Sequence, residues 1–358
     1  MVEGSPPLFS IVIRTIGRRY SILKQVLQHI DRTDLGLSSS DFEVVVSEDG
    51  PPYTLSEDLL NQDLSHIRVR YTPNTRSRGR EGNRNAGALA ARGKYLVLID
   101  DDALLPPNFL RALANAFEKA GESAIFSIPF GVSVDLLASP INTTPKWIRY
   151  LFSSWAPDKP PSLDEISLPP VASSIPYEEH WFAHGRLTCI SKMTYLELGG
   201  YTEIKFEGHS LPGCYVDDPE FSLRARSAGY KIYALRGVRI AHIEDHYIDT
   251  DRATARLYIE AHSQMMLRRL HPDKVHVHNA VDVFWHPQPL IRLWRLTRGE
   301  LFSALLPALT FLAKIKSISP YLTKKLAAMI WIGVTYKGLK DGRRASYQCA
   351  LIHEPPLR

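Results

Sequence analysis

The chain has little cysteine and no apolar run long enough to cross a membrane. Its 358 residues include 3 cysteines, which are scattered and form no CxxC pair, so neither a zinc ribbon nor a disulfide framework is indicated. Disulfide-dependent secreted folds carry more cysteine, and we therefore expect a reducing, cytosolic setting. The first residues lack the basic segment and apolar stretch of a signal peptide. The apolar runs 301–313 and 326–336 are both shorter than the ~20 residues that span a bilayer.

A glycine-rich phosphate loop is also missing. The turn after the first apolar strand, residues 14–19, reads RTIGRR and has one glycine, and no GxGxxG follows a strand. The sequence therefore disfavours a dinucleotide-binding dehydrogenase. It also disfavours a sugar nucleotidyltransferase, which would need such a loop after its first strand.

Short apolar runs alternate with helical stretches through the first third of the chain. This alternation predicts βαβ units and a mostly parallel sheet, whose active site lies beyond the carboxyl ends of the strands. We therefore expect Arg14, Thr15, Glu48, Asp49 and the acids at 100–102 to open into one crevice. The expected strands are 9–13, 42–46, 67–71, 95–99 and 124–128, and the expected helices are 18–30, 81–92 and 108–119.

The rest of the chain changes character twice. Residues 131–180 are rich in proline, which predicts an irregular insertion, either a lid or part of the acceptor surface. Regular structure is expected again from about residue 186, with helices at 219–228 and 251–270 and a strand at 231–234. Residues 287–358 contain 12 Lys and Arg but 3 Asp and Glu, against a formal net charge of +5 for the whole chain. Two interpretations of this apolar, basic end stay open: helices lying in a membrane interface, or helices packed on the catalytic part.

Three aspartates, Asp100, Asp101 and Asp102, follow the very apolar strand 95–99. Like charges packed together raise one another's pKa unless a cation compensates them. A divalent ion held by one or two carboxylates and by substrate phosphates resolves that cost. The alternative is a solvated acidic turn, which an isolated cluster would favour.

Three other segments carry polar groups that suit a nucleotide substrate. Glu48 and Asp49 end a strand before a Gly-Pro-Pro turn and suit a base or ribose contact, or a turn cap. Residues 76–85, RSRGREGNRN, offer arginine donors for phosphate, or form a solvated loop. Asp217 and Asp218 precede Pro219 at the start of a helix, where an aspartate is a good N-cap or, as Asp218, a general base.

Taken in order, these segments resemble family 2 glycosyltransferases. Residues 10–15 resemble the opening strand, 47–50 the "DDGS" turn with Glu48 at the first Asp, and 83–95 the "ARNxG…AxGxY" segment. Residues 100–102 resemble the D-x-D motif, 198–201 the "GGF" element, and 217–230 the "EDxE…R…GY" segment with Asp217 in place of Glu. His242 resembles a histidine that helps to hold the metal. The resemblance covers residues 8–245.

The resemblance implies a GT-A fold and an inverting, Mg²⁺- or Mn²⁺-dependent transfer from a nucleotide diphosphate sugar, with UDP the expected nucleotide. Asp218 is then the catalytic base, and Asp102, Asp100 and His242 hold the metal. Donor-binding residues are Arg14, Thr15, Glu48, Arg76, Arg84, Asp100 and Asp101. An acceptor or sugar pocket is expected from His184, Gly185, Arg186 and Asp217, although residues 184–186 also suit the entry of a core strand.

The expected organisation is a catalytic GT-A domain over residues 1–250, with donor binding in about 8–130 and the acceptor part in about 170–250, followed by a helical extension over 251–358. The expected partners are a nucleotide diphosphate sugar and a glycan or lipid-linked acceptor, as in polysaccharide biosynthesis, with peripheral contact to the inner face of the cell membrane. No aromatic-interleaved basic patch supports nucleic acid binding. The alternatives are a non-catalytic, membrane-associated scaffold that binds nucleotide sugars, and a sugar nucleotidyltransferase.

Overall fold

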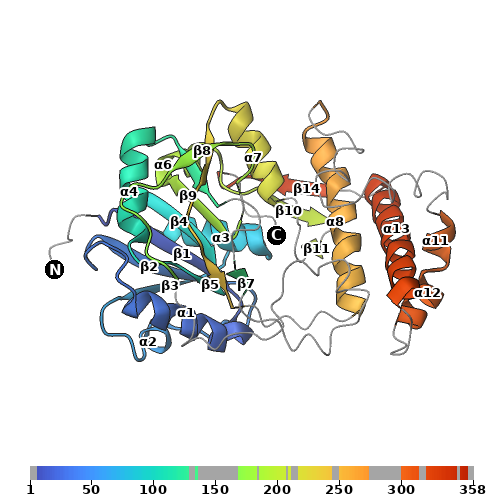
Figure 1. Cartoon of the computed structure of the whole chain (residues 1–358), viewed down its shortest axis with the longest axis horizontal. Helices are drawn as coiled ribbons and strands as arrows, with labels where there is room; N and C mark the ends of the chain where they lie inside the picture. The colour runs from blue at the N-terminus through green and yellow to red at the C-terminus, as the bar shows by residue number, and fades with distance from the viewer. Residues whose placement is uncertain are drawn as a thin grey trace.

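A twisted sheet of eight strands forms the centre of the larger, α/β part of the protein (Figure 1). The computed structural model describes residues 6–128, 134–135, 168–183, 185–206, 209–210, 217–243, 250–273, 300–313, 320–344 and 347–353. The strand order is β3-β2-β1-β4-β9-β6-β12-β8. The pairs of β1 with β2, β1 with β4, β2 with β3 and β6 with β12 are parallel, whereas β9 and β8 run antiparallel to their neighbours. The bounds are β1 Phe9–Thr15, β2 Phe42–Glu48, β3 Val69–Pro73, β4 Tyr95–Asp100, β6 Ile125–Ser127, β8 Tyr177–His180, β9 Leu187–Ser191 and β12 Ile232–Leu235.

Helices cover both faces of this sheet, which is why its strands are apolar on both sides. On β1, Ile11 and Ile13 pack in the core with α1 (Tyr20–Arg32) and α4 (Phe109–Ala120). Val12, which points the other way, packs with side chains of α3 (Arg80–Ala90), α6 (Lys192–Glu197) and α7 (Asp217–Ser227). The mostly parallel α/β fold expected from the sequence is confirmed. Strand β9 begins just after residues 184–186, where the entry of a core strand was one of two interpretations, but its antiparallel pairing between β4 and β6 was not expected.

Smaller elements complete the end of the sheet that carries the acids. A one-turn helix, η1 (Gly17–Arg19), follows β1, and α2 (Glu57–Leu60) lies between β2 and β3. The short strand β13 (Ala241–His242) pairs with β5 (Ala103–Leu104) and with β7 (Val134–Asp135). This pairing places His242 directly opposite Ala103, next to the three aspartates. Most of the expected insertion at 131–180 lies outside the described residues.

The C-terminal part is helical and then returns to the α/β part that contains the eight-stranded sheet. Helix α8 (Thr250–Leu270) packs along α13 (Pro320–Arg344), with α11 (Glu300–Ala304) and α12 (Leu306–Ala313) beyond it (Figure 1). The last strand, β14 (Tyr347–Ala350), pairs with β10 (Glu203–Phe206), which also pairs with β11 (His209–Ser210). The segment beyond residue 250 is therefore joined to the α/β part at its far end as well. No helix within the described residues is long and apolar enough to span a bilayer.

Candidate active site

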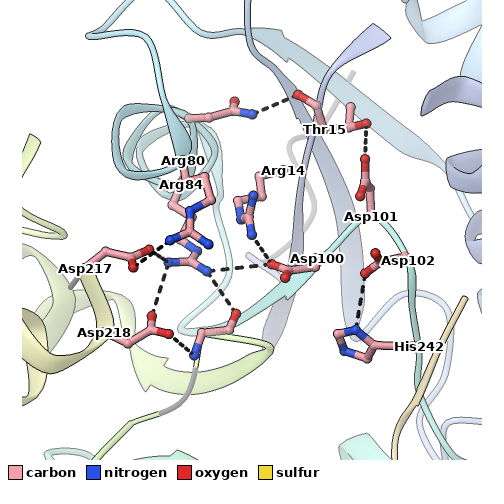
Figure 2. A network of polar contacts seen from close by, with 12 residues as sticks. Arg14, Thr15, Arg80, Arg84, Asp100, Asp101, Asp102, Asp217, Asp218 and His242 are labelled. Atoms are coloured by element: carbon pink, nitrogen blue, oxygen red, sulfur yellow. Dashed lines mark hydrogen bonds and ion pairs between the residues drawn. The ribbon is translucent and has the colours of Figure 1, made fainter. Parts of the chain in front are cut away.

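The carboxyl ends of β1, β2 and β4 meet in one place, as the topology predicts. The backbone N–H of Asp49 donates to the carbonyl oxygen of Thr15 at 2.9 Å, which joins the ends of β1 and β2. The hydroxyl of Thr15 donates to Oδ2 of Asp101 at 2.6 Å, and Arg14 pairs with Asp100 at 2.7 Å (Figure 2). The convergence of the polar strand ends is thus confirmed.

The three aspartates face different partners. Asp100 is turned towards Arg14, and Arg84 also approaches its Oδ1 at 3.6 Å. Burial opposes ionisation of Asp100, but the two guanidinium groups hold its pKa below the usual range. Burial and the adjacent carboxylate of Asp102 raise the pKa of Asp101 to about 7. Asp100, Asp102 and His242 were expected to hold one ion; Figure 2 shows Asp102 turned towards His242, and Asp100 turned towards Arg14.

The surroundings of Asp102 fit a divalent cation. Asp102 is 4% exposed, and its Oδ1 has no hydrogen-bond donor among the described residues. This oxygen lies 3.5 Å from Nδ1 of His242, which is itself buried. A buried carboxylate oxygen without a donor is costly, and carboxylate oxygen is the ligand that Mg²⁺ and Mn²⁺ prefer. No group of three or more His, Cys, Asp or Glu placed to hold a metal occurs in the described part of the chain.

Asp218 lies in the first turn of α7 and is held by the backbone of Gly185, which lies in the segment before β9. The N–H of Gly185 donates to Oδ2 of Asp218 at 2.8 Å, and Arg84 lies 3.4 Å from Oδ1. The side chain is 19% exposed and therefore remains partly accessible. Burial and the neighbouring Asp217 raise the pKa of Asp218 to about 6. This is a carboxylate that can accept a proton near neutral pH.

Two arginines of α3 hold the aspartate pair of α7 (Figure 2). Arg80 binds Oδ1 of Asp217 and Arg84 binds Oδ2, each at 2.9 Å. Both oxygens of Asp217 are therefore engaged by guanidinium groups, and the side chain is 2% exposed. Arg84 also donates to the carbonyl oxygen of Gly185 at 3.0 Å. Arg84, which was expected to bind the donor, thus links Asp217, Asp218 and Asp100.

The two acids at the end of β2 hold neighbouring loops. The carboxylate of Glu48 is fully buried and accepts hydrogen bonds from the backbone N–H groups of Thr54 and Leu55 and from the hydroxyls of Thr54 and Tyr71. Asp49 accepts from Asn74 at 2.8 Å and from the N–H of Gly79 at 3.0 Å. A base contact by Glu48 would require it to exchange one of these donors.

Arg76, expected to bind the donor, is engaged with a residue that the sequence gave no reason to single out. Its Nε pairs with Glu203, which is fully buried, and its Nη2 donates to the carbonyl oxygen of Leu351 at 3.4 Å. Glu203 also accepts from Ser77 at 2.8 Å and from Asn85 at 2.9 Å. A donor contact by Arg76 would require it to leave Glu203.

The remaining pocket residues are partly described. His184 lies outside the described residues, Gly185 carries the contact to Asp218, and Arg186 is half-buried just before β9. Sequence reasoning missed Arg19, Arg80 and Glu203 as individual residues. Arg80 lies within residues 76–85, a segment already noted for its arginines. The sequence around Arg19 and around Glu203 contains no motif that would mark either residue as part of a site. The carboxylates that Arg19 binds are at least 82 residues away in sequence, and the partners of Glu203 are at least 118 residues away.

Comparisons with known proteins find glycosyltransferases. Residues 10–163 match the model of Glycosyl transferase family 2. An uncharacterized glycosyltransferase of Methanocaldococcus jannaschii is 29% identical over 106 residues, which are 29% of this chain and 35% of the relative. The GalNAc(5)-diNAcBac-PP-undecaprenol beta-1,3-glucosyltransferase of Campylobacter jejuni is 27% identical over 117 residues, 32% of this chain and 35% of the relative. The chain matches only about a third of the length of these relatives.

A solved structure shares the fold. The mannosyltransferase of Pyrobaculum calidifontis, in complex with GDP-Man and Mn²⁺, has a TM-score of 0.51 and 16% sequence identity, over 95% of this chain and 90% of that one. At this identity the similarity describes the fold alone. Residues 10–163 of this chain thus match the Glycosyl transferase family 2 model, and the chain has the GT-A type of fold.

Proposed function

We propose that this protein is an inverting, metal-dependent glycosyltransferase that moves a sugar from a nucleotide diphosphate sugar, with UDP as the nucleotide, to a hydroxyl of a glycan or lipid-linked acceptor. The observation that carries the proposal is the placing of Asp218. A partly open carboxylate, oriented by Gly185, stands across from the carboxyl ends of β1 and β4 and is joined to them through Arg84. A scaffold without activity would have no use for a base held in this way.

In this mechanism the acceptor hydroxyl attacks the anomeric carbon while the bond to the diphosphate breaks. Asp218 accepts the proton that the hydroxyl loses. Its raised pKa of about 6 leaves it ionised at pH 7 and makes it a stronger base than an ordinary aspartate. Base catalysis of this kind contributes ~100- to 10,000-fold. Arg84 fixes the carboxylate and keeps it ionised, because its charge opposes the effect of burial.

The acids at the end of β4 form the donor side of the site. Mg²⁺ or Mn²⁺ at this position would supply charge neutralisation to the leaving diphosphate. Asp102, with His242 at 3.5 Å, and Asp100 would hold it. Arg14 and Thr15 orient Asp100 and Asp101 through their contacts at 2.7 and 2.6 Å. The mannosyltransferase of similar fold carries Mn²⁺ with its nucleotide sugar, which supports this assignment.

Asp218→Asn tests the base directly. The substitution keeps the shape of the side chain but removes the proton acceptor, so turnover should fall at least about 100-fold while the affinity for the donor nucleotide is retained. The assay is a panel of nucleotide sugars with Mn²⁺, followed by product analysis for turnover and by calorimetry for binding. Asp63→Asn, at an exposed aspartate paired with Lys24, is the matched control. Loss of both binding and turnover would show that Asp218 has a structural role instead.

A lipid-linked acceptor is supported by an apolar face on the C-terminal helices. Backbone hydrogen bonds from Leu305 to Leu301 and from Leu309 to Leu305 make α11 and α12 one nearly continuous helix. Its inner side buries Leu309, while Leu301, Leu305, Phe311 and Leu312 are 43–69% exposed. The intervening residues on the outer side, Ala304, Pro307 and Ala308, are exposed and apolar as well.

We infer that this apolar face rests on an anionic phospholipid surface. Residues 287–358 carry 12 Lys and Arg against 3 Asp and Glu, and of these Lys337, Lys340 and Arg344 are exposed on the adjacent α13. Apolar helices beside basic side chains bind such surfaces through buried area and electrostatic attraction. The Campylobacter jejuni relative is named for an undecaprenol-linked substrate, which agrees with a membrane-bound acceptor.

Vesicle sedimentation tests this contact. The protein should pellet with phosphatidylcholine vesicles that contain phosphatidylglycerol, and less with phosphatidylcholine alone. The double substitution Leu305→Ser and Phe311→Ser should abolish pelleting. Met193→Ser removes an apolar side chain that is 69% exposed on α6 of the catalytic part and should leave pelleting unchanged. A monomer–dimer change in the double variant, without any vesicle binding of the wild type, would show that a second copy covers this face.

A further inference from the structure

Arg19 occupies the position of a counter-cation on the acids at the end of β4. Its Nη1 lies 2.9 Å from Oδ1 of Asp101, and its Nη2 lies 2.7 Å from Oδ2 of Asp102. One guanidinium thus bridges two adjacent carboxylates that are 4% and 6% exposed. Two ionised carboxylates packed this closely would repel each other strongly without a compensating charge.

The guanidinium and a metal ion would compete for the same residue. Oδ2 of Asp102 is taken by Arg19, and Oδ1, 3.5 Å from His242, has no hydrogen-bond donor among the described residues. Both carboxylate oxygens of Asp102 become available to an ion only when the guanidinium of Arg19 has moved away from Oδ2. A positive group within hydrogen-bond distance of a carboxylate lowers the affinity of that carboxylate for any second cation.

Arg19 differs from the other arginines of the site in how it is held. It comes from the one-turn helix η1, none of whose residues is buried, and its side chain is 23% exposed. Arg84, by contrast, is 3% exposed in the middle of α3 and has contacts to Asp217, Asp218, Asp100 and Gly185. Arg84 is fixed in the structure, whereas Arg19 can leave the carboxylates by rotating its side chain into solvent.

We propose that Arg19 is the resident counter-cation of Asp101 and Asp102, and that the divalent metal must displace its guanidinium from these carboxylates in order to bind. Arg19 is then a positioning residue that stabilises the metal-free site and sets the metal affinity. The inference rests on the proposed function only in taking a divalent cation as the ligand of Asp102.

Arg19→Gln tests the proposal, with Arg18→Gln as the matched control. Arg18 is the exposed neighbour in the same turn, so both substitutions remove one positive charge from the same surface. Mn²⁺ is titrated into metal-free protein without nucleotide, and free Mn²⁺ is followed by electron paramagnetic resonance. Arg19→Gln should bind Mn²⁺ about tenfold more tightly than the wild type, and Arg18→Gln should stay close to the wild type. Arg19→Lys should fall between them, because a lysine ammonium neutralises one carboxylate but does not bridge two.

Thermal unfolding supplies a second readout that needs no turnover. Metal-free Arg19→Gln should melt below Arg18→Gln, and saturating Mn²⁺ should raise its melting temperature more than that of the wild type. Equal or weaker Mn²⁺ binding by folded Arg19→Gln, relative to Arg18→Gln, would overturn the proposal. A failure of sugar transfer with every donor, together with tighter Mn²⁺ binding by Arg19→Gln, would overturn the proposed function and leave this inference standing.

Discussion

Gly185 and Asp218 are joined by a backbone hydrogen bond of 2.8 Å, from the N–H of the glycine to Oδ2 of the aspartate. The carbonyl oxygen of the same glycine accepts from Arg84 at 3.0 Å. Gly185, in the segment before β9, therefore orients both the carboxylate that we propose as the base and the arginine beside it. A Cβ at Gly185 would collide with the carboxylate of Asp218 and the guanidinium of Arg84.

Gly185→Ala should therefore impair catalysis without removing a chemical group. The methyl group has to push Asp218 or Arg84 away, and a misplacement of about 1 Å at a reacting group costs roughly 100-fold in turnover. We expect kcat to fall by about that factor while donor affinity changes little. The measurement is steady-state kinetics beside calorimetric titration of the nucleotide.

Gly229→Ala is a suitable control for this variant. Nothing lies within 4 Å of its Cβ position, but its φ of +88° makes the substitution strained. It should lower stability without affecting turnover per folded molecule. If both variants lose activity only in proportion to unfolded protein, Gly185 has no special role in orienting Asp218.

The pH dependence of transfer should report the titration of Asp218. The base acts in its deprotonated form, and burial with the neighbouring Asp217 raises its pKa to about 6. Activity should therefore be full above this pH and fall tenfold per pH unit below it, since protonation removes the acceptor for the hydroxyl proton. The profile of kcat/KM with pH measures this. An acid limb centred near pH 4 would contradict the raised pKa.

Replacement of Arg84 by glutamine should shift the acid limb of the pH profile of kcat/KM. Arg84 lowers the pKa of Asp218 against the effect of burial, so its removal should shift the acid limb to higher pH. The change also leaves buried carboxylates without part of their compensating charge, which typically destabilises a protein by about 3–5 kcal/mol. Urea unfolding measures the loss of stability. A purely structural role for Arg84 would lower stability but leave the pH profile where it was.

The parts of the fold that follow local rules could be predicted from the sequence. Uninterrupted apolar runs such as 95–99 are typical of strands covered on both faces, and β4 forms there. Thr15 ends β1 and Asp101 follows β4. Their hydrogen bond could be predicted because the carboxyl ends of parallel strands lie at the same edge of a sheet. Strand β9 was harder to predict, because LTCIS is short and follows a proline-rich segment, and its strand identity depends on pairing with β4 and β6.

The missed site residues depend on contacts that are distant in sequence. Arg19 stands in an exposed-looking pair of arginines after a turn, and nothing in RTIGRR distinguishes it from Arg18. Only the fold brings it to Asp102, 83 residues away. The burial of Glu203 among Arg76, Ser77 and Asn85 likewise follows from the packing of β10 on the start of α3.

Ile352 links the end of the chain to the catalytic part. Shortening its side chain to alanine should therefore destabilise the catalytic part. Its N–H donates to the carbonyl oxygen of Gly199 at 2.8 Å, and its side chain, 6% exposed, packs in the core that includes Tyr195 and Phe221. Ile352→Ala should lower the free energy of unfolding by about 2–5 kcal/mol, the usual cost for a buried isoleucine. Urea unfolding, monitored for the catalytic part, measures it.

Leu301→Ala is the matched control for Ile352→Ala, because Leu301 is 57% exposed on α11 and surface changes usually stay within about 0.5 kcal/mol. The comparison separates two roles for the C-terminal part. The outer face of α11 and α12 should matter for vesicle binding and not for stability, whereas residues 347–353 should matter for stability. If Ile352→Ala were as mild as Leu301→Ala, the packing of Ile352 in the core around Tyr195 and Phe221 would contribute little to the stability of the catalytic part.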